Sequence, residues 1–370
     1  QYEPWLLNYQ GGFVRRGLPG ELFFQIHELL NFHLGWMVFF FVCFLYCLFY
    51  FTFFHLLKKI EFNKIFAFAI LSPIAFYFPI LNSKATGQKE IIFLCFLSIF
   101  CFLLPVMKRS HANYLMIFLT VIVGLSHDGL IFYLTYLVIP FIIFFKFENL
   151  KDLFLNLVPI IIVITVLTIL IYFFSGTAQH TIDICNSIKS YSHPECETIG
   201  HISHLRFSIT GNIEQKISIV EDIFKISNAR YFSIYGTGFI FGFLPLIILY
   251  SKSKLLIPTI GQKFHPLLIL FFPLLITFPI YYLAADWGRY LYISYMSSLI
   301  LIIFCLINNI FYIKRKNFID KDNMLVKILF IISIIIYGFG WTVPICCEKN
   351  FKPGISRAVK QVIYYYNKNN

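Results

Sequence analysis

Long runs of apolar residues alternate with short polar breaks along most of this chain. The runs are continuous and about 18 to 25 residues long, which lets an α-helix cross ~30 Å of hydrocarbon. They lack the short segments of alternating apolar and polar residues that are typical of membrane-spanning β-strands. The pattern therefore predicts membrane-spanning helices, and we place them at residues 35–57, 64–81, 90–107, 153–174, 231–250, 266–284, 290–312 and 324–345.

The stretch Tyr114–Phe145 differs from these runs. It has 32 residues, too many for one spanning helix and too few for two, and the polar sequence Ser126-His127-Asp128-Gly129 interrupts it near its middle. Polar backbone at membrane depth is tolerated only where it lines a cavity or is packed in protein. We therefore predict two short helices that meet at a buried break near 126–129. With these two, the chain has about ten membrane segments and an all-α, polytopic fold.

The same pattern divides the chain into five segments. An external N-terminal segment, residues 1–34, has apolar residues at helical spacing between Leu18 and Leu34, which predicts a helix lying in the membrane interface. Membrane helices follow at 35–174, an external loop at 175–230, further membrane helices at 231–345 and an external tail at 346–370.

Composition excludes a soluble protein with a polar exterior. Hydrophobic residues make up 59% of the 370 residues, charged residues make up only 13%, and the mean hydropathy is +0.76. A soluble domain needs far more polar side chains to cover its surface.

The basic residues orient the chain in the membrane. If the predicted segments alternate from an external N-terminus, five short connections on one side carry fifteen Lys and Arg residues. The short connections on the other side carry only Lys84, Lys89 and Arg289. The first side is cytoplasmic by the positive-inside rule, and a helix or cleaved signal before Gln1 would account for an external N-terminus. The net charge of +12 is then mainly a signal of topology, which disfavours nucleic acid as a partner.

No sequence motif indicates a metal or nucleotide cofactor. The chain has no CxxC, HExxH, P-loop or GxGxxG pattern, so we predict no cofactor and no metal site. The external loop holds several histidines and acids between His180 and Arg206, but their spacing fits no metal site and a solvated loop is the simpler interpretation. Cys185 and Cys196 lie in this loop and could pair in an oxidising compartment.

The N-terminal segment contains the pair Arg15 and Arg16, with glycines on both sides at Gly11, Gly12 and Gly17. Glycine lets the backbone turn sharply and bring two guanidinium groups to one place. Arginine is well suited to phosphate because it donates paired hydrogen bonds. An ordinary basic anchor beside the membrane is the alternative.

Three polar breaks on the external side carry the other candidate residues. Lys89 and Glu90 stand at the start of a predicted helix, where a capping role for Glu90 competes with function. His127 and Asp128 form an ionisable pair within the membrane profile, which is costly unless the pair is partnered or wetted. A histidine beside a carboxylate could move a proton or bind phosphate, although a structural histidine is the commoner case.

The turn Asp286-Trp287-Gly288-Arg289-Tyr290 is so short that both charged side chains must stay near the membrane surface. An ion pair between Asp286 and Arg289 that locks the turn is the structural alternative. The same pair could also face a cavity within the helices.

An external site with several cations, one or two carboxylates and a histidine suits a substrate whose anion is attached to a lipid. Polyprenyl-diphosphate-linked sugars fit, because the periplasm lacks nucleotide-linked donors. The motifs Gly12–Leu18, Gly87–Glu90, Ser126–Gly129 and Asp286–Tyr290 together resemble the oligosaccharide repeat-unit polymerases of the Wzy type, which serve surface polysaccharides such as O-antigen in lipopolysaccharide or capsule. This group is similar to other integral-membrane glycosyltransferases that use polyprenyl-linked donors.

The resemblance implies a glycosyltransferase that joins polyprenyl-diphosphate-linked (undecaprenyl diphosphate) repeat units on the periplasmic face of a bacterial inner membrane. Its partners would be the lipid-linked donor and acceptor glycans, the bilayer and a chain-length regulator. Charge then suggests roles. Arg15, Arg16 and Arg289, helped by Lys89, would stabilise the diphosphate, and His127 or Asp128, then Asp286, would be the base.

Two other classes of protein stay open. A flippase for lipid-linked oligosaccharide would need charged residues at mid-membrane in several helices, whereas the ionic groups here lie near one face. A membrane acyltransferase could use His127 and Asp128, but its acyl donor would be cytoplasmic. A different polyprenyl-phosphate-sugar-dependent glycosyltransferase would fit the same residues.

Overall fold

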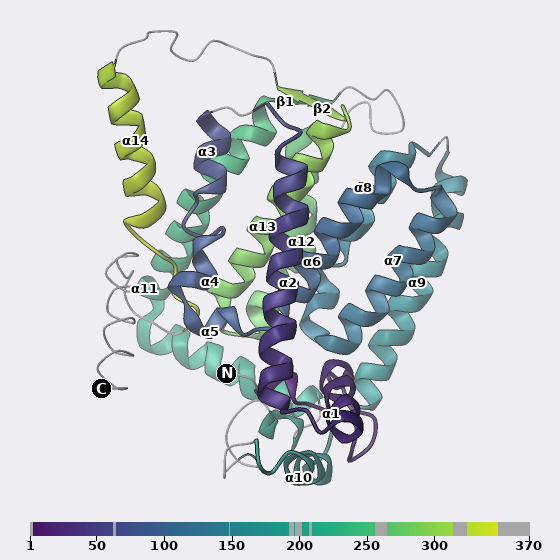
Figure 1. The fold of residues 1–370 in the computed structure, drawn as a ribbon. Helices are drawn as coiled ribbons and strands as arrows, with labels where there is room; N and C mark the ends of the chain where they lie inside the picture. The colour runs from purple at the N-terminus through teal and green to yellow at the C-terminus, as the bar shows by residue number, and fades with distance from the viewer. Residues whose placement is uncertain are drawn as a thin grey trace. The chain divides into compact units, whose positions relative to one another are not determined.

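The computed structural model describes residues 3–61, 64–147, 149–191, 196, 202–206, 209–255, 265–313 and 324–346. Its elements are labelled in Figure 1. Contacts divide the chain into two compact units. We call residues 1–56 with 87–218 the first unit, and residues 57–86 with 219–370 the second unit.

Six helices in the described part of the chain are long and apolar enough to cross a membrane. They span Leu34–Leu57, Asp128–Phe145, Leu150–Phe173, Phe232–Lys252, Pro266–Leu283 and Trp287–Ile307. Two shorter apolar helices lie at Glu90–Val106 and Ile328–Phe339. The prediction of a helical protein with the apolar helices of a membrane protein is confirmed, but these six are fewer than the ten segments predicted.

All regular elements in the described part of the first unit are helices (Figure 1). Its elements are η1 (Glu3–Trp5), α1 (Leu18–Leu30), α2 (Leu34–Leu57), α6 (Glu90–Leu103), η2 (Leu104–Val106), α7 (Arg109–Ser126), η3 (Asp128–Tyr133), α8 (Thr135–Phe145), α9 (Leu150–Phe173), α10 (Ala178–Ser187) and η4 (Ser203–Arg206). Helix α7 packs along α9, and α1 packs against α7. Helices α2 and α6 meet at a buried hydrogen bond of 2.7 Å between the Thr52 and Ser98 hydroxyls.

The predicted break near 126–129 is present. Helix α7 ends at Ser126, His127 is extended, and the chain resumes as η3 at Asp128. The first of the two helices is longer than predicted, because α7 begins at Arg109 rather than Tyr114 and has 18 residues. At 1.5 Å per residue α7 is ~27 Å long, close to the thickness of the hydrocarbon layer.

The second unit contains α3 (Lys64–Ile70), α4 (Tyr77–Leu81), α5 (Ser83–Thr86), β1 (Ser253–Leu255), α12 (Pro266–Leu283), α13 (Trp287–Ile307), β2 (Phe311–Ile313) and α14 (Met324–Phe339). The long helix α11 (Ile209–Lys252) begins in the first unit's residues and continues into the second. Helix α13 is buried along nearly its whole length, and it packs against α12. Its Tyr295 hydroxyl donates to the Ala69 carbonyl at 2.7 Å.

The prediction of one continuous helix at 64–81 is wrong. Helix α3 ends at Ile70, residues 71–76 form turns, and α4 begins only at Tyr77. Pro73 lacks an N–H, and its ring disfavours helical backbone at Ser72. The Ser72 hydroxyl donates instead to the Gly242 carbonyl of α11 at 3.2 Å.

Two further details depart from the predicted pattern. Strands β1 and β2 form a small antiparallel pair with Lys254 opposite Tyr312, so the fold is not purely helical. Helix α11 begins at Ile209, inside the segment predicted as a loop at 175–230. The predicted tail at 346–370 lies outside the described residues apart from Cys346.

Candidate functional site

The two arginines of the N-terminal segment sit on a tightly turned loop. Gly12 has φ of 116° and Arg16 has φ of 65°, a left-handed conformation that few residues other than glycine adopt. Backbone conformations of this kind persist only where the surrounding structure holds them, and they cluster at functional sites.

Three hydrogen bonds hold this loop in place. The Arg15 N–H donates to the Phe174 carbonyl, just after α9, at 3.0 Å. The Tyr9 N–H donates to the Glu21 carboxylate of α1 at 2.8 Å. Upstream of the loop, the buried Trp5 indole donates to the Gly87 carbonyl at 2.6 Å, which ties the N-terminal segment to the residues before α6.

Asp128 binds both arginines at the break between α7 and η3. Its carboxylate accepts a hydrogen bond from Arg15 Nη1 at 3.2 Å and one from Arg16 Nε at 2.6 Å. The Asp128 side chain is only 15% exposed, and Arg15 is buried. A carboxylate that carries two guanidinium partners has its negative charge stabilised. This geometry suits a residue that orients the arginines better than one that accepts a proton.

Lys89 lies beneath the same loop and is fully buried. Its Nζ donates to the backbone carbonyl of Arg16 at 2.7 Å. Burial, together with the nearby Arg16 charge, lowers the pKa of Lys89 well below its usual value. Glu90, the first residue of α6, is also buried and lies close enough to favour the charged lysine. Lys89 therefore stabilises the left-handed turn at Arg16 through its hydrogen bond to the Arg16 carbonyl.

His127 is placed beside Asp128, and its Nδ1 accepts a backbone hydrogen bond. Its Nδ1 accepts a hydrogen bond from the Gly129 N–H at 3.1 Å and lies 3.6 Å from Asp128 Oδ1. A ring nitrogen that accepts an N–H carries no proton, so the proton of the neutral ring resides on Nε2. In this geometry Nε2 is a hydrogen-bond donor.

We call Arg15, Arg16, Lys89, His127 and Asp128 the arginine–aspartate cluster. Burial lowers the pKa of Arg15, Asp128 opposes that effect, and Arg16 reinforces it, but an arginine stays charged at neutral pH. Two guanidinium groups therefore share the Asp128 carboxylate, and Lys89 lies next to them with Glu90 close by. Preorganised guanidinium groups favour an anion with several oxygens.

The cluster lies at one end of the first unit. It joins the loop before α1 to the end of α7, the start of α6 and the end of α9. Arg109 and Asp152 form an ion pair of 2.9 Å at the opposite ends of α7 and α9. The basic residues Lys108, Arg109, Lys146 and Lys151 stand at the helix ends of that far side. Within this unit, the candidate residues and the loop lysines are thus separated by the length of α7.

A cap of polar residues packs on the arginine loop. Gly11 lies against α10, where an added Cβ would come within 3.0 Å of Asp183 Cβ. Asn8 donates to the Ser187 hydroxyl at 2.9 Å. Cys185 of α10 forms a disulfide with Cys196, as the sequence allowed. The same end of the first unit therefore carries both the disulfide and the cluster.

The second unit holds the remaining predicted residues. Arg289 Nη1 lies 2.8 Å from Asp286 Oδ2, and Asp286 caps the start of α13 by position. Asp286 is 36% exposed, whereas Arg289 is buried. The Gly288 N–H donates to the Ile345 carbonyl at 3.0 Å, and a side chain at Gly288 would collide with the Pro344 carbonyl.

The predicted site residues are divided between the two units. Arg15, Arg16, Lys89, Glu90, His127 and Asp128 belong to the first unit, and Asp286 and Arg289 belong to the second.

Metal ligation finds no support in the described part of the chain, where no group of three or more His, Cys, Asp or Glu could hold an ion. His193, Glu195, Glu197 and His201, noted in the sequence, lie outside the described residues. Three residues that hold the arginine loop were not predicted, namely Trp5, Tyr9 and Glu21. The tryptophan and the acid on either side of a glycine-rich arginine pair could have pointed to them.

The chain matches no protein-family model, no curated protein and no solved structure. What the fold defines is therefore a class, a helical protein with the apolar helices of a membrane protein and a buried cationic cluster.

Proposed function

We propose that this protein is a membrane glycosyltransferase that extends polyprenyl-diphosphate-linked oligosaccharides on the periplasmic face of a bacterial inner membrane. Its substrates are a lipid-linked donor glycan and a lipid-linked acceptor glycan, it needs no cofactor, and a chain-length regulator is a further partner. The observation that carries the proposal is the arginine–aspartate cluster, in which Arg15 and Arg16 share Asp128 beside apolar helices.

The geometry of the cluster supports a diphosphate as ligand. A diphosphate presents several oxygens in a small volume, and guanidinium groups bind such oxygens through paired hydrogen bonds. Asp128 fixes both arginines in advance, so binding costs little reordering of their side chains. Arg16 is the more exposed of the two, with 23% of its side chain accessible, and is the residue that meets the ligand first.

The position of the disulfide supports an external orientation. Disulfides persist in oxidising compartments, and Cys185–Cys196 lies at the cluster's end of the first unit. The loop lysines and arginines lie at the opposite end, where the positive-inside rule places the cytoplasm. Both arguments support the proposal of a periplasmic position for the cluster.

The reaction that fits is displacement at the sugar's anomeric carbon. An acceptor hydroxyl oxygen forms a bond to that carbon, the bond from the carbon to the diphosphate oxygen breaks, and the electron pair leaves with polyprenyl diphosphate. The arginines and the Nε2–H of His127 stabilise the charge that develops on the leaving group. The hydroxyl proton passes to a base, and the assignment of that base among His127, Asp128 and Asp286 stays a prediction.

The surface glycan of a deletion strain tests the proposal. The glycan is separated by length on a gel, and the strain is complemented with the wild-type chain or with Arg16→Ala. A polymerase predicts a single repeat unit on the lipid core in the deletion strain, long chains with the wild type, and a single unit with Arg16→Ala. Absence of any unit in the deletion strain would instead indicate a flippase or an earlier transferase, and long chains would exclude a role in polymerisation.

A further inference from the structure

Helix α1, which lies beside the start of α2 (Figure 1), presents three faces of different character. Spacings of three and four residues put three exposed apolar side chains on one face, which consists of Leu22, Ile26 and Leu29. A second face is polar and consists of Glu21, Gln25 and Glu28. The third face is buried and includes Pro19, Gly20 and Phe23. Leu29, which is 81% exposed, thus points away from the protein.

The buried face fixes the orientation of α1. A Cβ built on Gly20 would collide with the Leu7 carbonyl, so the helix lies directly against the backbone of the N-terminal segment. The Phe23 ring packs edge-on against Phe41 of α2, with ring centroids 5.3 Å apart. A rotation of α1 that covered Leu29 would break both contacts. The apolar face is therefore held outward by the rest of the first unit.

Exposed apolar residues continue from α1 into α2. Residues 31–33 join the two helices, and Phe32 and Trp36 are 49% and 56% exposed. Further along α2, the exposed aromatic residues are Phe39, Phe40 and Phe44. Helix α2 is long and apolar enough to cross a membrane, so hydrocarbon is the medium that suits these rings, and tryptophan is typical of the membrane boundary. The outward face of α1 is thus continuous with the side of α2 that suits acyl chains.

The arginine–aspartate cluster lies alongside α2 rather than beyond its end. The buried Trp5 ring contacts Phe41, with ring centroids 5.9 Å apart, and its indole donates to the Gly87 carbonyl. Gly87 precedes Lys89 by two residues, and the Lys89 Nζ donates to the Arg16 carbonyl. Phe41 is the eighth residue of α2, so it lies ~10 Å from the start of that helix. The cluster is therefore level with the first turns of α2.

We infer that the apolar face of α1 is embedded among the acyl chains of the bilayer, and that the arginine–aspartate cluster takes its anion from a lipid head group rather than from water. The second step rests on the proposed function, which supplies a diphosphate as the anion. Helix α1 contains no lysine or arginine, so burial of its apolar side chains, and not attraction to anionic lipid, holds it in the membrane. It begins two residues after Arg16, so the embedded helix anchors that arginine at the depth of the lipid phosphates. A lipid-linked diphosphate is already at this depth, whereas a soluble one has to leave water.

Photo-crosslinking from α1 tests the first step. Benzoylphenylalanine replaces Ile26 in the full chain, which is placed in nanodiscs of phosphatidylethanolamine, and the matched control carries the same group at Glu28 on the polar face. Two residues rotate the side chain by about 200° around the helix. Phospholipid adducts should be about tenfold more abundant from position 26 than from position 28. Equal yields, or adducts from position 26 to a second copy of the chain, would overturn the inference.

Diphosphate from two sources tests the second step. Undecaprenyl diphosphate is added to the nanodisc lipids of one sample, and inorganic diphosphate is titrated into the buffer of another in a calorimeter. We expect the wild type, repurified in detergent, to retain about tenfold more undecaprenyl diphosphate than Arg16→Ala does. Inorganic diphosphate should give no heat that depends on Arg16. Heat that Arg16→Ala abolishes would show that the cluster is open to water, and would overturn the inference.

These outcomes separate the inference from the proposed function. Selective phospholipid adducts at position 26, with neither diphosphate bound, would keep α1 in the membrane and reject the diphosphate site on which the proposed function depends. A long surface glycan that depends on Arg16, with equal adduct yields from positions 26 and 28, would keep the glycosyltransferase and reject the embedded position of α1.

Discussion

Replacing Asp128 by Asn should destabilise the first unit, and the size of the loss distinguishes an orienting role from a purely catalytic one. Asparagine keeps the size of the side chain but removes the charge that Arg15 and Arg16 share. Removal of one partner of a buried ion pair costs ~3–5 kcal/mol because the remaining charge is left uncompensated. Taking ~3 kcal/mol and a shift of ~2–4 °C per kcal/mol, the midpoint of thermal unfolding should fall by ~6–12 °C. If Asp128 acted only as a base, polymer would be lost while the midpoint stayed unchanged.

A double-mutant cycle provides the control. Arg16→Gln combined with Asp128→Asn should recover ~1–3 kcal/mol relative to the sum of the single variants, because the two side chains are in contact. The double variant should still make no long glycan. Asp152→Asn breaks a comparable pair with Arg109 in the same unit, but Asp152 is 33% exposed, so the loss should be at most ~1 kcal/mol. The thermal unfolding midpoints of the wild type, Asp128→Asn and Asp152→Asn, measured on purified proteins in one detergent, test the orienting role of Asp128. A loss for Asp128→Asn no larger than for Asp152→Asn would refute the orienting role.

Three further predictions follow from named contacts. Lys89→Met removes the hydrogen bond to the Arg16 carbonyl, so the long surface glycan should fall by about tenfold while immunoblots of membranes show an unchanged protein level. Lys89→Arg should lose as much glycan, because the larger side chain does not fit a fully buried site; full glycan with Lys89→Arg would argue that only a positive charge is needed at this position. Cys185→Ser should lower the free energy of unfolding by ~2–4 kcal/mol in a denaturant titration, whereas Cys43→Ser, at an exposed free cysteine, should change nothing. Equal effects of the two substitutions would contradict a stabilising role for the Cys185–Cys196 disulfide. Burial and the neighbouring Glu21 raise the pKa of Tyr9 to about 12, above the value of 10.0 expected in the unfolded chain, so the free energy of unfolding should fall as the pH rises from 10 to about 12, where only the unfolded state loses this proton. Tyr9→Phe should flatten this part of a curve of unfolding free energy against pH, and an unchanged slope would contradict the raised pKa.

The helical class was predictable because lipid imposes a strong constraint on sequence. Backbone groups in hydrocarbon must be satisfied within the element, so spanning helices leave long apolar runs. The break at His127 was also predictable, since Ser-His-Asp-Gly is too polar to continue an apolar helix. The interruption at 71–76 was missed because apolar content takes no account of the backbone donor that Pro73 lacks.

The candidate site was predictable as a set of residues but not as a set of contacts. Charge and glycine content singled out Arg15, Arg16 and Asp128, and the structure brings them together. That Asp128 would bridge both arginines depends on packing between segments more than 100 residues apart, which no local pattern encodes. The role of Lys89 at the diphosphate stays a prediction, and its hydrogen bond to the Arg16 carbonyl was not predictable from the sequence.

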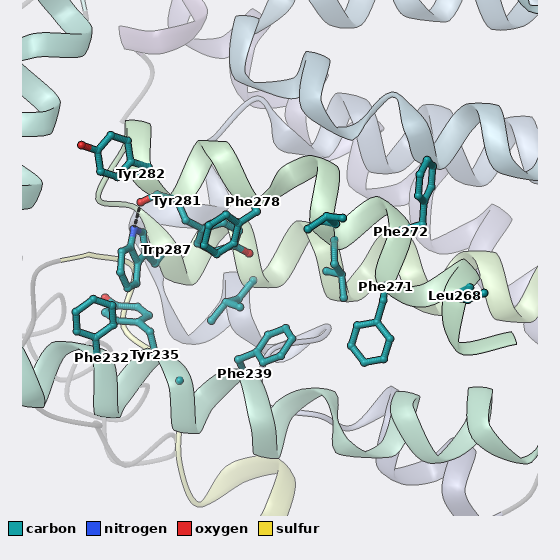
Figure 2. A pocket seen from close by; sticks show the side chains of 14 residues that line it. Phe232, Tyr235, Phe239, Leu268, Phe271, Phe272, Phe278, Tyr281, Tyr282 and Trp287 are labelled. Carbon is teal, nitrogen blue, oxygen red and sulfur yellow. Dashed lines mark hydrogen bonds between the residues drawn. The ribbon is translucent and has the colours of Figure 1, made fainter. Parts of the chain in front are cut away.

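The apolar groove between α11 and α12, lined among others by Phe239 and Phe271 (Figure 2), could not have been found from sequence. Its leucines and aromatic residues are of the same types as the residues on the other faces of α11 and α12, so only the arrangement of the helices distinguishes them.

Glycan synthesis by the purified protein tests the central claim most directly. The wild-type chain and Arg16→Ala are placed in liposomes that contain an undecaprenyl-diphosphate-linked repeat unit, and the length of the lipid-linked glycan is measured by mass spectrometry. The account predicts glycans of two or more repeat units with the wild type, released undecaprenyl diphosphate in proportion to the bonds formed, and neither product with Arg16→Ala. Repeat units that stay single with the wild-type chain, or that lengthen equally with Arg16→Ala, would contradict it.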